Sequence, residues 1–139
     1  MAAKRIAYRS GYKYQLATAY PIKINIRPRK DIDTEFIKLK RSGHLTVARG
    51  YAWDGPSGPV VDTRQNMRAS LVHDALYQLM RKKLLSVKTH KDKADKLFKK
   101  MCIEDGVSRT TAQIYYFGLK LGGKPATDPR NRKKIKKAP

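Results

Sequence analysis

The sequence predicts an α+β fold, with an N-terminal antiparallel β-sheet followed by a three-helix half and a basic tail. Two observations support this prediction. Before residue 50, apolar and polar residues alternate in short runs, which is the pattern of half-buried strands. After residue 65, apolar residues recur at helical spacing. Between these regions, YAWDGPSGP (residues 51–59) combines glycines with prolines and predicts a tight, irregular loop.

The strand region contains two alternating stretches, YQLATAYPIKINI and FIKLKRSGHLTVARGY. Within the second stretch, Ser42 and Gly43 interrupt the alternation with residues that favour turns. We therefore expect a β-hairpin from Phe36 to Val47.

Residues 66–83 are nearly free of glycine and proline and rich in helix-forming side chains, so they predict the first helix. Ser86 or Thr89 can cap the second helix, and Ser108 can cap the third. Gly106 ends the second helix. The second helix carries an apolar stripe at i, i+3, i+4, i+7 and i+8, formed by Ala94, Leu97, Phe98, Met101 and Cys102.

Gly122 and Gly123 end the third helix, and the following residues have no periodicity and a cluster of basic side chains. We expect a single α+β domain over residues 1–123 and a disordered basic tail over residues 124–139.

The charge balance favours a polyanionic partner. The 139 residues include 32 Lys and Arg against 11 Asp and Glu, a net charge of +21. Nucleic acid, an anionic membrane and an acidic protein assembly all fit this excess, and the charge alone does not choose among them. The single cysteine, Cys102, allows neither an internal disulfide nor a cysteine-based zinc site. With no long apolar segment, we expect synthesis in a cytoplasm.

His73 and Asp74 are adjacent in the first predicted helix, followed one turn later by Tyr77. A histidine acts as a general base when a carboxylate orients its far ring nitrogen. Asp74 cannot do so, because successive helical side chains point about 100° apart. Asp95 can, because an antiparallel helix pair places it at a comparable distance from the connecting turn.

Asp74 is then free to face the DGPSGP loop. Calcium takes carboxylate and backbone carbonyl oxygens, and glycine allows such carbonyls to turn inward. A histidine-held water beside such a metal would form a hydrolytic centre. We therefore expect Ca2+ as the candidate cofactor.

This arrangement resembles phospholipase A2, including the form in parvovirus capsid proteins: a glycine-rich calcium loop, an H-D-x-x-Y helix and an A-D-x-x-F helix. The matching segments are residues 51–59, 73–77 and 94–98. The resemblance implies His73 as general base, Asp95 as its orienting carboxylate and Tyr77 as a supporting hydroxyl. It further implies Asp74 as a calcium ligand together with loop carbonyls near Gly55 and Gly58.

A closer resemblance is to an uncharacterised family of small proteins in tailed bacteriophages and their prophages, recognised by a D-G-x-S-x-x-P loop and an H-D-x-L-Y helix. WDGPSGP, RASLVHDALY and KADKLFKKM match its order over most of residues 20–123. The resemblance implies a phage origin. We expect a virion-associated protein, structural or delivered during infection, that is made in the host cytoplasm and then carried in the virion. Its expected partners are other phage structural proteins, non-specifically bound DNA and an anionic membrane.

The same residues can also have a purely structural role. His73 can hydrogen-bond across the core, and Asp74 can pair with an arginine such as Arg68 or Arg81. Asp95 can pair with Lys99 one turn away. In that case the protein is not an enzyme and acts in assembly or by contacting DNA.

A helix-turn-helix protein is the alternative function, because residues 96–120 read as a helix, a turn at Gly106 and a second helix. On that hypothesis the start of the second helix faces bases. Independently of it, the basic tail can contact phosphates without reading sequence. The residues expected to contact nucleic acid are Arg109, Thr110, Gln113, Arg130, Arg132, Lys133, Lys134, Lys136 and Lys137.

Overall fold

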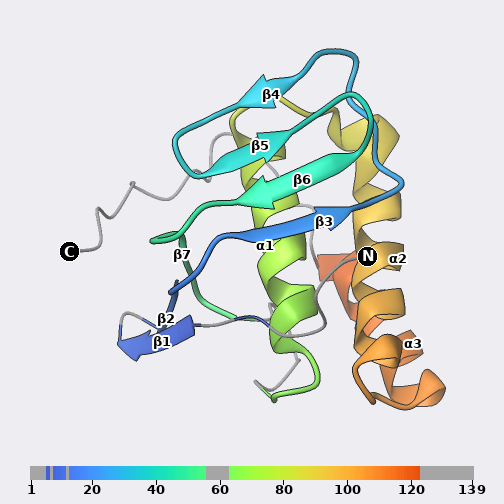
Figure 1. Cartoon of the computed structure of the whole chain (residues 1–139). Helices are drawn as coiled ribbons and strands as arrows, with labels where there is room; N and C mark the ends of the chain where they lie inside the picture. Colours follow the sequence, from blue (N-terminus) through green and yellow to red (C-terminus); the bar gives the residue numbers. More distant parts are fainter. Residues whose placement is uncertain (1–5, 7, 12, 56–62, 123–139) are drawn as a thin grey trace. The chain divides into compact units, whose positions relative to one another are not determined.

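A computed structural model of the chain describes residues 6, 8–11, 13–55 and 63–122. These residues fall into two compact units, one ending at Asp54 and the other beginning at Gly55. Antiparallel strands make up the first unit and three helices the second, so the predicted α+β fold is confirmed (Figure 1). The predicted single domain stays a prediction, and the tail over residues 124–139 lies outside the described residues.

The larger sheet of the first unit has four antiparallel strands in the order β3-β6-β5-β4 (Figure 1). Its strands are β3 (Tyr20–Lys23), β4 (Ile32–Asp33), β5 (Ile37–Leu39) and β6 (His44–Val47). Strands β5 and β6 form the predicted hairpin, in which Ile37 lies opposite Val47 and Leu39 opposite Leu45. All four of these side chains are buried, because a strand turns alternate side chains to one face.

The second sheet of the first unit has the order β1-β2-β7 and is also antiparallel. Its strands are β1 (Tyr8–Gly11), β2 (Lys13–Leu16) and β7 (Ala52–Trp53). Tyr14 lies opposite Trp53, and the centroids of their rings are 5.6 Å apart. This aromatic pair joins strands that are distant in the sequence.

The second unit contains α1 (Met67–Arg81), α2 (Val87–Glu104) and α3 (Arg109–Gly122). The predicted caps are confirmed: Ser86 Oγ accepts a hydrogen bond from the amide of Thr89, and Ser108 Oγ accepts one from the amide of Thr111. Helices α1 and α2 run antiparallel, and α2 contacts both of its neighbours (Figure 1).

Arg68, near the start of α1, joins this helix to the end of α2. Its guanidinium donates to both carboxylate oxygens of Asp105, at 2.9 and 3.1 Å, and to Glu104 at 2.9 Å. The forked geometry of arginine matches a carboxylate, so this buried cation holds α1 and α2 in register.

The α2 stripe packs largely as predicted. Ala94, Phe98, Met101 and Cys102 are buried, and Leu97 is half-buried. Burial raises the pKa of the Cys102 thiol to about 12, so it stays protonated and behaves as a small apolar side chain.

Within the described ranges, no helix has the length and apolar character needed to cross a membrane.

Candidate active site

Asp95 is the centre of a polar cluster inside the helical unit. Its Oδ1 lies 2.7 Å from Nε2 of His73 and also accepts the Tyr77 hydroxyl, and its Oδ2 lies 2.8 Å from Nζ of Lys91. We refer to His73, Tyr77, Lys91 and Asp95 as the Asp95 cluster. The predicted partnership of His73 with Asp95 is therefore present in the structure, and Tyr77 joins it.

Helical periodicity explains how two elements supply four converging side chains. His73 and Tyr77 are one turn apart on α1, and Lys91 and Asp95 are one turn apart on α2, so each pair shares a helix face. The centroids of the His73 and Tyr77 rings are 4.0 Å apart. Phe98, one turn beyond Asp95, meets the His73 ring edge-on at 5.3 Å and excludes water from this side of the imidazole.

The electrostatics of the cluster keep Asp95 ionised. Burial by itself raises the pKa of this carboxyl, but hydrogen bonds from His73, Lys91 and Tyr77 outweigh burial, and the pKa lies below its ordinary value. Burial, followed by the hydrogen bond to Asp95, raises the pKa of Tyr77, so its hydroxyl remains a donor. The cluster thus holds a buried carboxylate with a donor on each side.

Sequence reasoning missed Lys91. This side chain donates to Asp95 and also to the backbone carbonyl of Leu119 on α3, at 3.2 Å, so it links the cluster to the third helix. The structural alternative that paired Asp95 with Lys99 is wrong, because Lys99 donates to the side-chain oxygen of Gln113. Both lysines are four positions from Asp95, and the packing of α3 decides which one turns inward.

Two of the three predicted calcium ligands, Asp74 and Gly55, lie among the residues that the structure describes. Asp74 is half-buried on α1, and Gly55 has a positive φ of 81°, while Gly58 lies outside the described residues. Within the described ranges, no three His, Cys, Asp or Glu side chains gather where they could hold a metal ion. Calcium binding stays a prediction.

The residues predicted to contact bases lie at the start of α3. Arg109 and Thr110 are exposed, but Gln113 is half-buried and accepts the hydrogen bond from Lys99. The basic residues predicted to contact phosphates from the tail, Arg130, Arg132, Lys133, Lys134, Lys136 and Lys137, lie outside the described residues.

Chemically, the cluster can orient an imidazole for proton transfer. An ionised Asp95 favours the tautomer in which Nε2 of His73 carries the proton, which makes Nδ1 the basic nitrogen. The His73 side chain is only 4% exposed, so most of the imidazole is shielded from solvent.

A family of known sequences matches more than half of the chain. A family described as a protein of unknown function (DUF1353) matches residues 31–119, which include α1, α2 and most of α3. Searches of the curated proteins and of the solved structures returned no match.

Proposed function

Because this chain belongs to the DUF1353 family, whose description assigns no function, we propose one from the Asp95 cluster. The protein is a virion-associated phage protein, structural or delivered during infection, whose His73 and Asp95 hydrolyse lipid esters in the manner of phospholipase A2. The observation that carries the proposal is the convergence of His73 and Tyr77 on one buried oxygen of Asp95.

Each side chain has a defined part in this chemistry. Asp95 orients the imidazole and stabilises the positive charge that His73 acquires when its Nδ1 takes a proton from water. The resulting hydroxide adds to the ester carbonyl carbon, the bond to the leaving oxygen breaks, and that oxygen takes the proton back from Nδ1. Tyr77 and Lys91 position Asp95 without touching substrate.

The basic charge supports the choice of substrate. A net charge of +21 attracts the protein to anionic lipid, which raises the local concentration of ester bonds. The predicted ligand Asp74 would add calcium to the site, a contribution that the test below separates from that of His73.

The decisive experiment measures fatty acid released from phosphatidylglycerol vesicles, with calcium and with a chelator. We expect release by the wild-type protein and a loss of about 100-fold or more for His73→Ala. His44→Ala is the matched control, because His44 is exposed on β6 in the other unit and lies outside the cluster. A folded wild-type protein that releases no fatty acid under either condition overturns the proposal and leaves the cluster a structural core.

Nucleic-acid recognition by α2 and α3 is the second candidate, favoured by the exposure of Arg109 and Thr110 at the start of α3. Its test is binding of a panel of duplexes by Arg109→Ala and Thr110→Ala. A sequence-dependent loss supports readout of bases, and an equal loss on every duplex contradicts it.

A further inference from the structure

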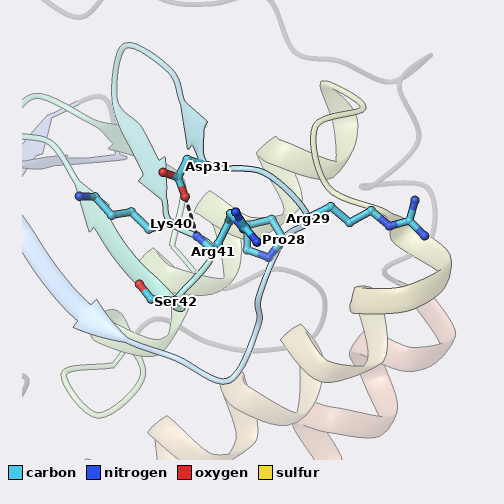
Figure 2. Close-up of a pocket in the computed structure, with 6 residues that line it drawn as sticks. All are labelled: Pro28, Arg29, Asp31, Lys40, Arg41 and Ser42. Carbon is cyan, nitrogen blue, oxygen red and sulfur yellow. Dashed lines mark hydrogen bonds between the residues drawn. The ribbon is translucent and has the colours of Figure 1, made fainter.

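An open pocket in the first unit has no part in the proposed hydrolysis. It lies where the segment before β4 meets the turn between β5 and β6, and none of its residues belongs to the Asp95 cluster (Figure 2). We name it the Arg41 pocket. Its lining residues are Pro28, Arg29, Asp31, Lys40, Arg41 and Ser42.

Backbone hydrogen bonds hold the walls of the Arg41 pocket in place. The amide of Arg41 donates to Oδ1 of Asp31 at 2.8 Å, which ties the turn to the segment before β4 (Figure 2). Gly43 donates to the carbonyl of Lys40 at 2.8 Å, and its own carbonyl accepts from Ile24 at 2.9 Å. The pocket is therefore preorganised, and binding there costs little ordering of the backbone.

Gly43 makes this close approach possible. Its φ is +91°, and a Cβ at this position would lie 2.3 Å from the carbonyl oxygen of Ile24. Only glycine allows the turn to approach the neighbouring segment so closely.

The chemistry of the lining suits phosphate. Among the described lining residues, three exposed cationic side chains, Arg29, Lys40 and Arg41, stand against one acidic side chain, Asp31. One oxygen of Asp31 is already engaged by the amide of Arg41. Ser42 adds a hydroxyl that lies 2.6 Å from Nδ1 of His44. Arginine and lysine are the side chains that most often contact phosphate oxygens.

We propose that the Arg41 pocket binds the phosphodiester backbone of double-stranded nucleic acid without reading its sequence. The pocket is shallow and open to solvent, as a site for the outer surface of a duplex must be. Arg29 and Lys40 extend to opposite sides of Arg41, which suits a row of phosphates better than one anion (Figure 2).

The composition of the lining favours a duplex over other phosphate-bearing partners. Among the described residues, its lining contains no aromatic ring on which the bases of a single strand would stack. Of the lining residues that the structure describes, only Pro28 is apolar, and a single proline is a poor surface for the acyl chains of a lipid. This inference is independent of the hydrolytic function, because it involves different residues.

Fluorescence anisotropy with a labelled duplex of about 20 base pairs measures the affinity of the protein for DNA. The titration is repeated at several salt concentrations, because each phosphate contact releases counterions and makes the affinity depend on salt. The test variant is Arg29→Ala/Lys40→Ala/Arg41→Ala. The matched control, Lys23→Ala/Lys38→Ala/Arg49→Ala, removes the same charge from exposed positions of the first unit outside the pocket. Circular dichroism checks the folding of both proteins.

For the pocket variant we expect affinity to fall at least tenfold, and the slope of log K against log salt to decrease by about 2.7, or about 0.9 per lost contact. The control should lose much less affinity. Equal losses in the two variants overturn the proposal, because they assign binding to general charge. The proposal is also overturned if the pocket variant binds the duplex as tightly as the wild-type protein does. In that case, a loss of binding to phosphatidylglycerol vesicles would assign the pocket to lipid, and a loss of binding to inorganic phosphate would assign it to a free anion.

Discussion

Nε2 of His73 lies 2.7 Å from Oδ1 of Asp95, although 22 residues separate them in the sequence. The contact joins α1 to α2 inside the helical unit, and it is independent of any catalytic role. Its energetic weight can therefore be measured separately from activity.

Replacing Asp95 by asparagine should lower the free energy of unfolding by about 3 kcal/mol, because it removes the buried carboxylate that faces Lys91 and His73. Urea unfolding at neutral pH measures this change. Asp33→Asn is the control: Asp33 is exposed, and we expect less than about 0.5 kcal/mol. Equal losses of unfolding free energy at the two positions would show that the Asp95 cluster stabilises the fold no more than an exposed carboxylate does.

The contribution of Asp95 should disappear in acid. Its pKa in the folded protein lies below the ordinary value of 3.8, so its stabilisation is present above that value and is lost as the pH falls through the folded pKa. The difference in unfolding free energy between the wild-type protein and Asp95→Asn should therefore shrink below about pH 4. A difference that stays constant down to pH 2 contradicts this assignment.

Tyr77→Phe should cost about 1.5–3 kcal/mol of stability, since it removes one hydrogen bond to an ionised carboxylate and keeps the ring. If His73 is the general base, the variant should retain most of its hydrolytic activity, because Lys91 and His73 still hold Asp95. Vesicle hydrolysis and urea unfolding of the same preparation separate the two effects. Loss of activity with unchanged stability would place Tyr77 in the chemistry.

His90 should weaken the fold in mild acid. Among the described residues, its Nδ1 is a buried atom without a hydrogen-bond partner. Burial, and secondarily Lys93, lowers the pKa of His90 below its ordinary value of 6.5. Stability therefore falls as the pH drops below about 6.5, because the unfolded chain binds the proton more readily.

His90→Leu removes both the unpaired atom and the proton site. It should raise stability by about 1 kcal/mol at pH 8 and by more at pH 5. Thermal unfolding at the two pH values measures the effect. A gain that does not depend on pH would assign it to apolar packing alone.

Gly43→Ala should destabilise the first unit by at least about 2 kcal/mol, because alanine at positive φ is strained and its Cβ meets a backbone oxygen that cannot move aside. Gly122→Ala is the comparison, since a Cβ there meets nothing within 4 Å. Its effect should stay within about 1 kcal/mol. Chemical denaturation measures the unfolding free energy of both variants. Similar losses in the two would contradict the close approach of Gly43 to Ile24.

Local features of the sequence were sufficient to predict many elements. Ser86 and Ser108 begin their helices because a serine hydroxyl accepts an otherwise unpaired amide hydrogen. The β5–β6 hairpin follows from alternation around Ser42 and Gly43. The pairing of His73 with Asp95 was predictable as well, because a helical hairpin places residues equidistant from its turn side by side.

Other features depend on contacts between residues distant in sequence. The pairing of β3 with β6 and of β2 with β7 crosses long stretches of chain, and alternation does not identify a partner strand. The choice of Lys91 over Lys99 at Asp95 depends on where α3 packs, and the Arg41 pocket exists because Asp31 fastens a remote turn.

The sequence by itself therefore determined the α+β class, the helix limits and the partner of His73, because caps, turns and periodicity act over a few residues. Tertiary structure alone decided that Asp95 is buried with three donors and that Arg29, Lys40 and Arg41 share a pocket. Burial and convergence arise from packing between segments, and packing between segments has no local signature in the chain.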